Sequence, residues 1–261
     1  MTLFNHHEKT LFYTALMFYT RIRVPVNTPY SEDLLAESRK YFTSIGLVIG
    51  AIACTTFLFF QLFLPLSISV MLSMISTVLA TGAFHEDGFA DSCDGFGGGW
   101  NANQVLTIMK DSRIGTYGTV ALIGILSVKF GLLYELATIS PAAWCLCTLS
   151  AHTVSRQHSS RVIEHHQYVQ DIDKSKVKPI ANKPLTHAAN LFSNWVALAP
   201  CLLLALYSIE AVIIGMVSAY WASKILIQYS AKRIGGYTGD VLGAIQQVTE
   251  VLFLLVCVAL I

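Results

Sequence analysis

Long apolar runs, separated by short polar segments, extend along most of the chain. A helix that crosses the hydrocarbon layer of a membrane needs about 20 mostly apolar residues. Seven runs approach that length: 41–64, 66–84, 117–137, 139–155, 187–208, 209–230 and 241–261. They lack the alternation of barrel strands, and a backbone group cannot stay unpaired in lipid. We therefore predict an all-α, polytopic bundle of about seven transmembrane helices, in one membrane-embedded domain over residues 1–261.

The N-terminal segment, residues 1–40, differs from these runs. Its apolar stretch 8–24 is too short to cross a membrane and contains Arg21 and Arg23 near its end, so an interfacial or re-entrant helix is predicted. The segment has no basic leader region and no small-residue cleavage motif. It is therefore not predicted to be a cleaved signal peptide.

Composition excludes an ordinary water-soluble enzyme. The chain is 54% hydrophobic and only 13% charged, against roughly 25% charged residues in typical soluble domains. Residues 41–84 contain no Asp, Glu, Lys or Arg. The net charge of +1 gives no basic field for nucleic acid, so the lipid bilayer is the predicted large partner. The 6 cysteines contain no CxxC pair and predict no disulfide framework.

The lysines and arginines lie on one side of the predicted bundle. Apart from Lys129 and Lys224, which fall within spans, they occupy residues 1–40 and the loops 85–116, 156–186 and 231–240. The alternate loops carry none. Because basic loops stay in the cytoplasm, we predict a multi-pass protein of the cytoplasmic (inner) membrane with its C-terminus outside. Lys129 and Lys224 could snorkel or pair with Glu135, although six positions is poor helical spacing for a pair of Lys129 with Glu135.

The polar segment with the most chemical information is 85–100, HEDGFADSCDGFGGGW. Asp87, Asp91 and Asp94 follow helical spacing and fall within about 60° of one helix face, whereas Glu86 points elsewhere. Stacked carboxylates repel one another unless a cation neutralises them, and oxygen ligands suit Mg²⁺, Mn²⁺ or Ca²⁺. A solvated surface cap is the alternative, but it is less favoured in a chain with only 16 Asp and Glu residues.

A second segment, 109–118 (MKDSRIGTYG), concentrates groups that bind phosphate. Lys110, Ser112 and Arg113 form a compact donor set for phosphate oxygens, although the two cations also fit the role of membrane anchors. Arg156, at the end of a predicted span, has the same two interpretations. The loop 156–186 that follows is expected to be solvated, with a lid over a phosphate-bearing substrate as the alternative.

The third segment, 232–244 (KRIGGYTGDVLGA), leads into the last predicted span. Asp240 lies at the predicted cytoplasmic mouth, level with the acidic segment, and is a candidate fourth metal ligand. A turn and helix N-cap over 237–240 is the alternative. Asp240 shares one side of the helix with Gln247 and Glu250, and such an ionisable stripe is expected to face the bundle interior.

Together the three segments resemble the cobalamin synthase family, the adenosylcobinamide-GDP ribazoletransferases of vitamin B12 assembly. They match that family's HEDG, DG and GGG elements, its KDSRxGTYG element and its GGxTGDxLGA element, and their order and spacing agree over nearly the whole chain. The resemblance implies a cytoplasmic-membrane enzyme that uses Mg²⁺. Such an enzyme joins adenosylcobinamide-GDP to alpha-ribazole or its 5'-phosphate and releases GMP.

The resemblance and the residue chemistry together give each side chain an expected role. The expected metal ligands are Asp87, Asp91, Asp94 and Asp240, with Glu86 next in line. The expected phosphate-binding side chains are Lys110, Ser112, Arg113, Arg156, Lys232 and Arg233. His85 or a metal-free carboxylate would accept the proton of the attacking hydroxyl, and His85, Asp94 and Arg113 form the expected catalytic set on the cytoplasmic face. The oligomeric state stays open.

Two other classes of membrane protein compete with this interpretation. The DxxDG pattern of Asp91–Gly95 also looks like the first half of the metal motif of CDP-alcohol phosphotransferases, but the following Ala-Arg and the second DxxxD half are missing. A phosphotransferase of that type is the nearer alternative. An ion transporter is the more distant one, because the carboxylates lie at the predicted rim and no internal repeat is present.

Overall fold

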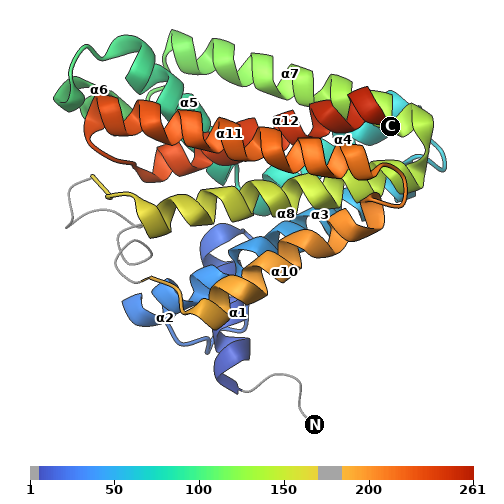
Figure 1. The fold of residues 1–261 in the computed structure, drawn as a ribbon, viewed down its shortest axis with the longest axis horizontal. Helices are drawn as coiled ribbons and strands as arrows, with labels where there is room; N and C mark the ends of the chain where they lie inside the picture. Colours follow the sequence, from blue (N-terminus) through green and yellow to red (C-terminus); the bar gives the residue numbers. More distant parts are fainter. Residues whose placement is uncertain (1–5, 170–183) are drawn as a thin grey trace.

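The computed structural model describes residues 6–169 and 184–261, so part of the predicted loop 156–186 lies outside the described residues. The described chain is helical and contains no strand, apart from one isolated bridge between Tyr168 and Tyr237 (Figure 1). The helices are α1 (His6–Tyr19), α2 (Glu32–Ser38), α3 (Phe42–Phe60), α4 (Leu66–Thr81), α5 (Phe84–Gly98), α6 (Ala102–Met109), α7 (Thr116–Ile139), α8 (Pro141–His165), α10 (His187–Leu204), α11 (Ile209–Ile234) and α12 (Gly239–Leu260), with a 3₁₀ turn, η1 (Arg39–Tyr41), before α3.

Each of the seven predicted spans coincides with a helix, but not every one of these helices is long and apolar enough to cross a membrane. Five candidates among the described residues meet both criteria: Glu32–Phe60, α7, α10, α11 and α12. α4 has only 16 residues and qualifies only together with α5, from which it is bent by 86°. The all-α membrane architecture is confirmed. Of the seven predicted crossings, five helices are long and apolar enough by composition, or six if the bent pair is one broken span.

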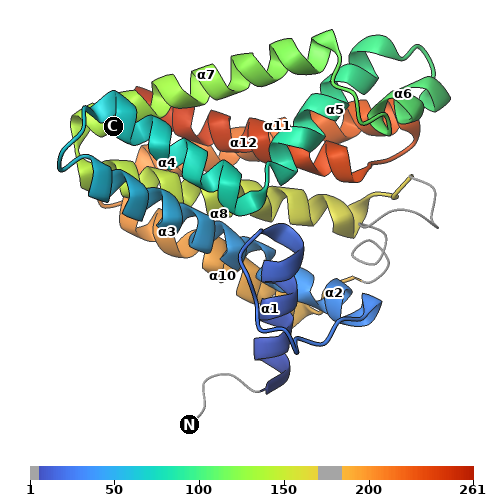
Figure 2. The same cartoon turned by 180° about the vertical axis from the view of Figure 1, so that it is seen from behind.

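α8, a predicted span that is too polar to meet the hydropathy criterion, is the centre of the bundle. It lies between α3 and α10 on one side and α11 and α12 on the other (Figures 1 and 2). All of residues 150–160 are buried, although most of them are polar. Polar side chains are tolerated there because they face neighbouring helices rather than lipid. Hydropathy therefore detected only the first half of a helix that has 25 residues.

A sharp break between α4 and α5 sets the direction of the acidic segment. Gly82 and Ala83 both adopt left-handed backbone angles, with φ of 69° and 58°. A Cβ on Gly82 would collide with the side chain of Arg21, and the Arg21 amide donates to the carbonyl of Ala80 at 2.7 Å. The turn is thus fixed against the segment that follows α1. α1 itself is the short helix found where an interfacial or re-entrant helix was predicted.

Candidate active site

The acidic segment forms the helix that its spacing predicts, and its carboxylates lie along α5. Asp87 is exposed, Asp91 is half-buried and Asp94 is only 7% exposed. The charges of Asp87, Asp240 and Asp94 all act on the Asp91 carboxylate. The structure thus gathers the four predicted carboxylates from α5 and α12 at one edge, which we call the acidic edge.

Close packing of α5 on α12 brings Asp240 to this edge. A Cβ on Gly88 would lie 2.9 Å from the Asp240 Cα, so only glycine permits this approach. Thr238, whose hydroxyl accepts from the Val241 amide at 3.3 Å, is the N-cap of α12. The turn and cap expected over 237–240 are therefore present, but Thr238 makes the cap and Asp240 does not. The helix cap thus explains the presence of Thr238 and does not explain that of Asp240.

Asp94 has a second set of partners that the sequence did not predict. Its two carboxylate oxygens accept the backbone amides of Gly115 at 2.7 Å and Gly118 at 2.8 Å. A Cβ on either glycine would collide with the carboxylate. Negative charge at the N-terminus of a helix is stabilised by the helix dipole. Asp94 therefore joins the acidic segment to the start of α7, beside its predicted role as a metal ligand, which stays a prediction.

Glu86 leaves the aspartate face, as its spacing predicts, and enters the bundle interior. It is 7% exposed, and its Oε1 accepts a hydrogen bond from Gln247 Nε2 at 3.1 Å. Gln247 Nε2 also donates to Gln246 Oε1 at 2.8 Å, and Gln246 Nε2 donates to Glu250. A chain of buried side chains on α12 therefore connects the acidic segment to Glu250.

Glu250 is the anionic centre of a buried ion cluster. It is 1% exposed, it pairs with Lys129 of α7, and its Oε2 lies 3.0 Å from His152 Nδ1 and 3.9 Å from Arg156 Nη1 of α8. Lys129 therefore pairs with Glu250 and not with Glu135, in agreement with the poor spacing of that alternative. The structure places Arg156 in this cluster, 2% exposed, and not at the surface where phosphate contact was predicted. Ionisable residues within apolar runs are the sequence signal for such a cluster, although their partners are not readable from it.

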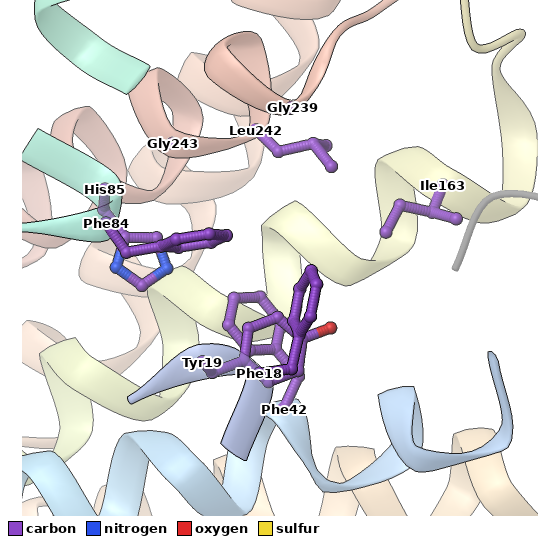
Figure 3. A pocket seen from close by; sticks show the side chains of 9 residues that line it. All are labelled: Phe18, Tyr19, Phe42, Phe84, His85, Ile163, Gly239, Leu242 and Gly243. Atoms are coloured by element: carbon purple, nitrogen blue, oxygen red, sulfur yellow. The ribbon is translucent and has the colours of Figure 1, made fainter. Parts of the chain in front are cut away.

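His85 lines an apolar pocket beside the acidic edge (Figure 3). The open space in it is about 30 Å³, room for about one water molecule, and aromatic rings of Phe18, Tyr19, Phe42 and Phe84 form much of its wall. The His85 ring stacks on Phe42 with centroids 5.8 Å apart, and its Nε2 is buried without a hydrogen-bond partner in the described structure. The pocket is thus nearly filled by its own side chains, and the His85 imidazole is a buried polar group in its wall.

The remaining predicted phosphate-binding groups lie around the same end of the bundle. Lys110, Ser112 and Lys232 are exposed. Arg113 is also exposed and forms a fork on Asp111, with Nη2 to Oδ2 at 2.6 Å, which lowers the pKa of Asp111 to about 2. Arg233 donates to the Gly99 carbonyl at 2.6 Å and to the Tyr229 hydroxyl at 2.7 Å. Arg233 thus ties the end of α11 to the glycine-rich end of the acidic segment.

No group of three or more His, Cys, Asp or Glu side chains in the described residues is arranged to hold a metal ion by itself. The acidic edge nevertheless fits Mg²⁺ in donor chemistry, because its carboxylates repel one another and a dication would relieve that repulsion. Mg²⁺ also commonly binds through one or two carboxylates together with substrate phosphates, and not in a complete protein cage. The arrangement therefore suits an ion that is bound together with a pyrophosphate.

The fold and this site define a class of protein: a polytopic helical membrane protein whose carboxylate-rich edge suits phosphoryl transfer with a divalent ion. The sequence profile of the family described as cobalamin-5-phosphate synthase matches residues 11–258, and the chain belongs to that family.

Relatives of known name cover nearly the whole chain. The protein named adenosylcobinamide-GDP ribazoletransferase from Shewanella frigidimarina is 44% identical over 97% of this chain and 95% of its own length. Proteins of the same name from Shewanella amazonensis and Shewanella oneidensis are 42% and 41% identical, over 97% and 94% of this chain and 96% and 92% of theirs. No solved structure shows significant similarity to the chain. The predicted family is thus confirmed.

Proposed function

We propose that this chain is an adenosylcobinamide-GDP ribazoletransferase, which transfers the phosphocobinamide part of adenosylcobinamide-GDP to alpha-ribazole or alpha-ribazole 5'-phosphate. The products are GMP and adenosylcobalamin or its 5'-phosphate. One observation carries the proposal: three segments far apart in the sequence meet at one place. Asp94 of the first binds the amides of Gly115 and Gly118 in the second, and Gly88 of the first packs on Asp240 of the third.

The proposed cofactor is Mg²⁺, held by Asp87, Asp91 and Asp240 together with the pyrophosphate of the substrate. When bound there, the ion would neutralise phosphate charge and make GMP a better leaving group. Asp94 is proposed to position the edge through its two amide contacts and to remain available as a further ligand. Glu86 is the least suited of the five predicted ligands, because it leaves the aspartate face and enters the bundle interior, where Gln247 donates to it.

The side chains of the protein are proposed to bind, orient and deprotonate the substrates. Arg113 and Lys110 would contact the phosphates, and Lys232 would add positive charge near them. Arg233 would act indirectly, because its guanidinium holds the end of the acidic segment. His85 or a carboxylate free of metal would accept the proton of the ribazole hydroxyl, which attacks the phosphorus on the corrinoid side.

The proposed location is the cytoplasmic (inner) membrane, with the acidic edge on the cytoplasmic side. The distribution of Lys and Arg supports this orientation, since Lys110, Arg113, Lys232 and Arg233 all lie near the end of the bundle that holds the edge.

The direct test is an assay of the purified full-length protein. We expect adenosylcobinamide-GDP, alpha-ribazole and Mg²⁺ to yield GMP and a cobalamin in equal amounts. Turnover of a CDP-activated alcohol without any cobalamin formation would instead assign the edge to a phosphotransferase of the CDP-alcohol type and contradict the proposal.

A further inference from the structure

A cleft rich in basic side chains lies between the C-terminal half of α8 and the middle of α11, which run side by side in Figure 1. We call it the basic cup. It encloses about 740 Å³ including its open mouth, and five of its lining side chains are basic: His158, Arg161, His165, His166 and Lys224. No carboxylate is among the described residues that line it.

The charges of the basic cup are not neutralised within the described residues. Neither Arg161 nor Lys224 forms an ion pair there; Arg161 donates only to Asn194 Oδ1, at 3.1 Å. Burial lowers the pKa of His166, and the charges of Lys224 and His165 lower it further. The unpaired cations Arg161 and Lys224, with no carboxylate beside them in the described part of the chain, leave positive charge in the cup that an anion would neutralise.

An apolar groove continues from the basic cup along α8, α10 and α11. Its open space is about 300 Å³, and its walls include Val154, Leu191, Trp195, Leu198 and Met216. His158 and Arg161 line both the cup and the groove, so the two hollows adjoin. Trp195 is 60% exposed and Leu191 48% exposed, so the groove opens to the outside of the bundle. The combined shape is amphipathic, with cations at one end and apolar side chains along the rest.

The basic cup is separate from the acidic edge and its pocket. Ile163 of α8 lines the pocket beside His85, whereas His158 lines the cup. At 100° per residue the two positions are about 140° apart around the helix. α8 therefore divides the two sites, and a ligand in the cup lies on the other face of that helix from the proposed substrates.

We propose that the basic cup and its groove bind one anionic phospholipid. Its phosphate would lie between Arg161 and Lys224, and an acyl chain would follow the groove past Trp195. Basic pockets between membrane helices bind anionic headgroups, and arginine and lysine form strong charge-assisted hydrogen bonds with phosphate. A free phosphate would explain the cations but would leave the apolar groove empty. The lipid would brace α8 against α10 and α11.

The test measures thermal stability of the full-length protein in detergent while lipid is added. Dioleoyl phosphatidylglycerol should raise the melting temperature to a plateau, whereas dioleoyl phosphatidylcholine, with the same chains, should not. In Arg161→Gln/Lys224→Gln the phosphatidylglycerol needed for half of the shift should rise roughly 30-fold, because each Lys or Arg near an anionic headgroup contributes about a fivefold gain in affinity. Lys9→Gln/Arg23→Gln, which removes the same charge from exposed sites outside the cup, should behave like the unaltered chain.

Further variants and a second ligand complete the test. Trp195→Ala should weaken the response to phosphatidylglycerol by shortening the groove contact. If the double variant does not fold, Lys224→Gln alone should still need roughly fivefold more lipid, and Arg161→Lys should respond almost normally. Equal shifts with both lipids, or an unchanged requirement in the variants, would overturn the proposal. A shift of the same size with sodium phosphate alone would assign the cup to free phosphate and would also overturn it.

Discussion

Asp94 connects two of the three segments through a single side chain. Each of its oxygens accepts one backbone amide, from Gly115 or Gly118, in a buried position. An amide side chain would present a donor to one of these N–H groups. We expect Asp94→Asn to lower the free energy of unfolding by about 2 kcal/mol, since hydrogen bonds to a charged group are involved. It should also abolish turnover.

Asp87→Asn is the matched control for Asp94→Asn, because Asp87 is exposed on the same helix. Denaturant titration in detergent should show a change within about 0.5 kcal/mol for Asp87→Asn. Equal stability of the two variants would show that the amide contacts of Asp94 do not hold the segments together.

The ion cluster around Glu250 makes a separate prediction about stability. Removal of one partner of a buried pair leaves the other charge uncompensated, so Lys129→Met and Glu250→Gln should each lower the free energy of unfolding by about 3–5 kcal/mol. The double variant should lose clearly less than the sum of the two. Glu135→Gln, on an exposed carboxylate of α7, should have almost no effect. Additive losses in the double-variant cycle would contradict the Lys129–Glu250 pairing.

At the scale of elements, the contact between α5 and α12 positions Asp240. A methyl group on Gly88 would meet the Asp240 backbone, 2.9 Å from its Cα and 3.0 Å from its carbonyl oxygen, and backbone cannot move aside as a flexible side chain can. We expect Gly88→Ala to reduce turnover at least tenfold and to cost about 1–3 kcal/mol of stability. Gly124→Ala is the control, because nothing lies within 4 Å of its Cβ. Similar activity of both variants would show that the close approach is unimportant.

The elements themselves were largely readable from the sequence, because apolar run length and aspartate spacing are local signals. A helix at each predicted span, the helical acidic segment and the inward stripe of Gln247 and Glu250 are confirmed. The polar half of α8 was not read as part of a core helix, because its burial comes from neighbouring helices. The partners of Lys129 and of Asp94 were missed for the same reason: each contact joins segments that only the tertiary fold brings together.

At the scale of the whole molecule, the three segments share one end of the bundle, and the C-terminus lies at the other (Figure 1). If the basic loops are cytoplasmic, α8 and the bent pair of α4 and α5 must also cross the membrane, although α8 is too polar to qualify by composition. A reporter fused after residue 166 should then report the cytoplasm and one fused after residue 261 should report the outside. α12, with 22 residues and among the most apolar of the candidate spans, separates the two sides. A cytoplasmic C-terminus would contradict the proposed orientation.

The central claim is that α5 and α12 together form one Mg²⁺-dependent transfer site. The most direct measurement is GMP release by Asp240→Asn as Mg²⁺ is varied. Thr238 caps α12, so the asparagine removes the charge of residue 240 and leaves the helix cap intact. We predict a turnover reduced at least 100-fold, or a greatly raised Mg²⁺ requirement, with an unchanged melting temperature. Ordinary turnover with the Mg²⁺ requirement of the unaltered chain would contradict the claim and would leave the cation to the carboxylates of α5 alone.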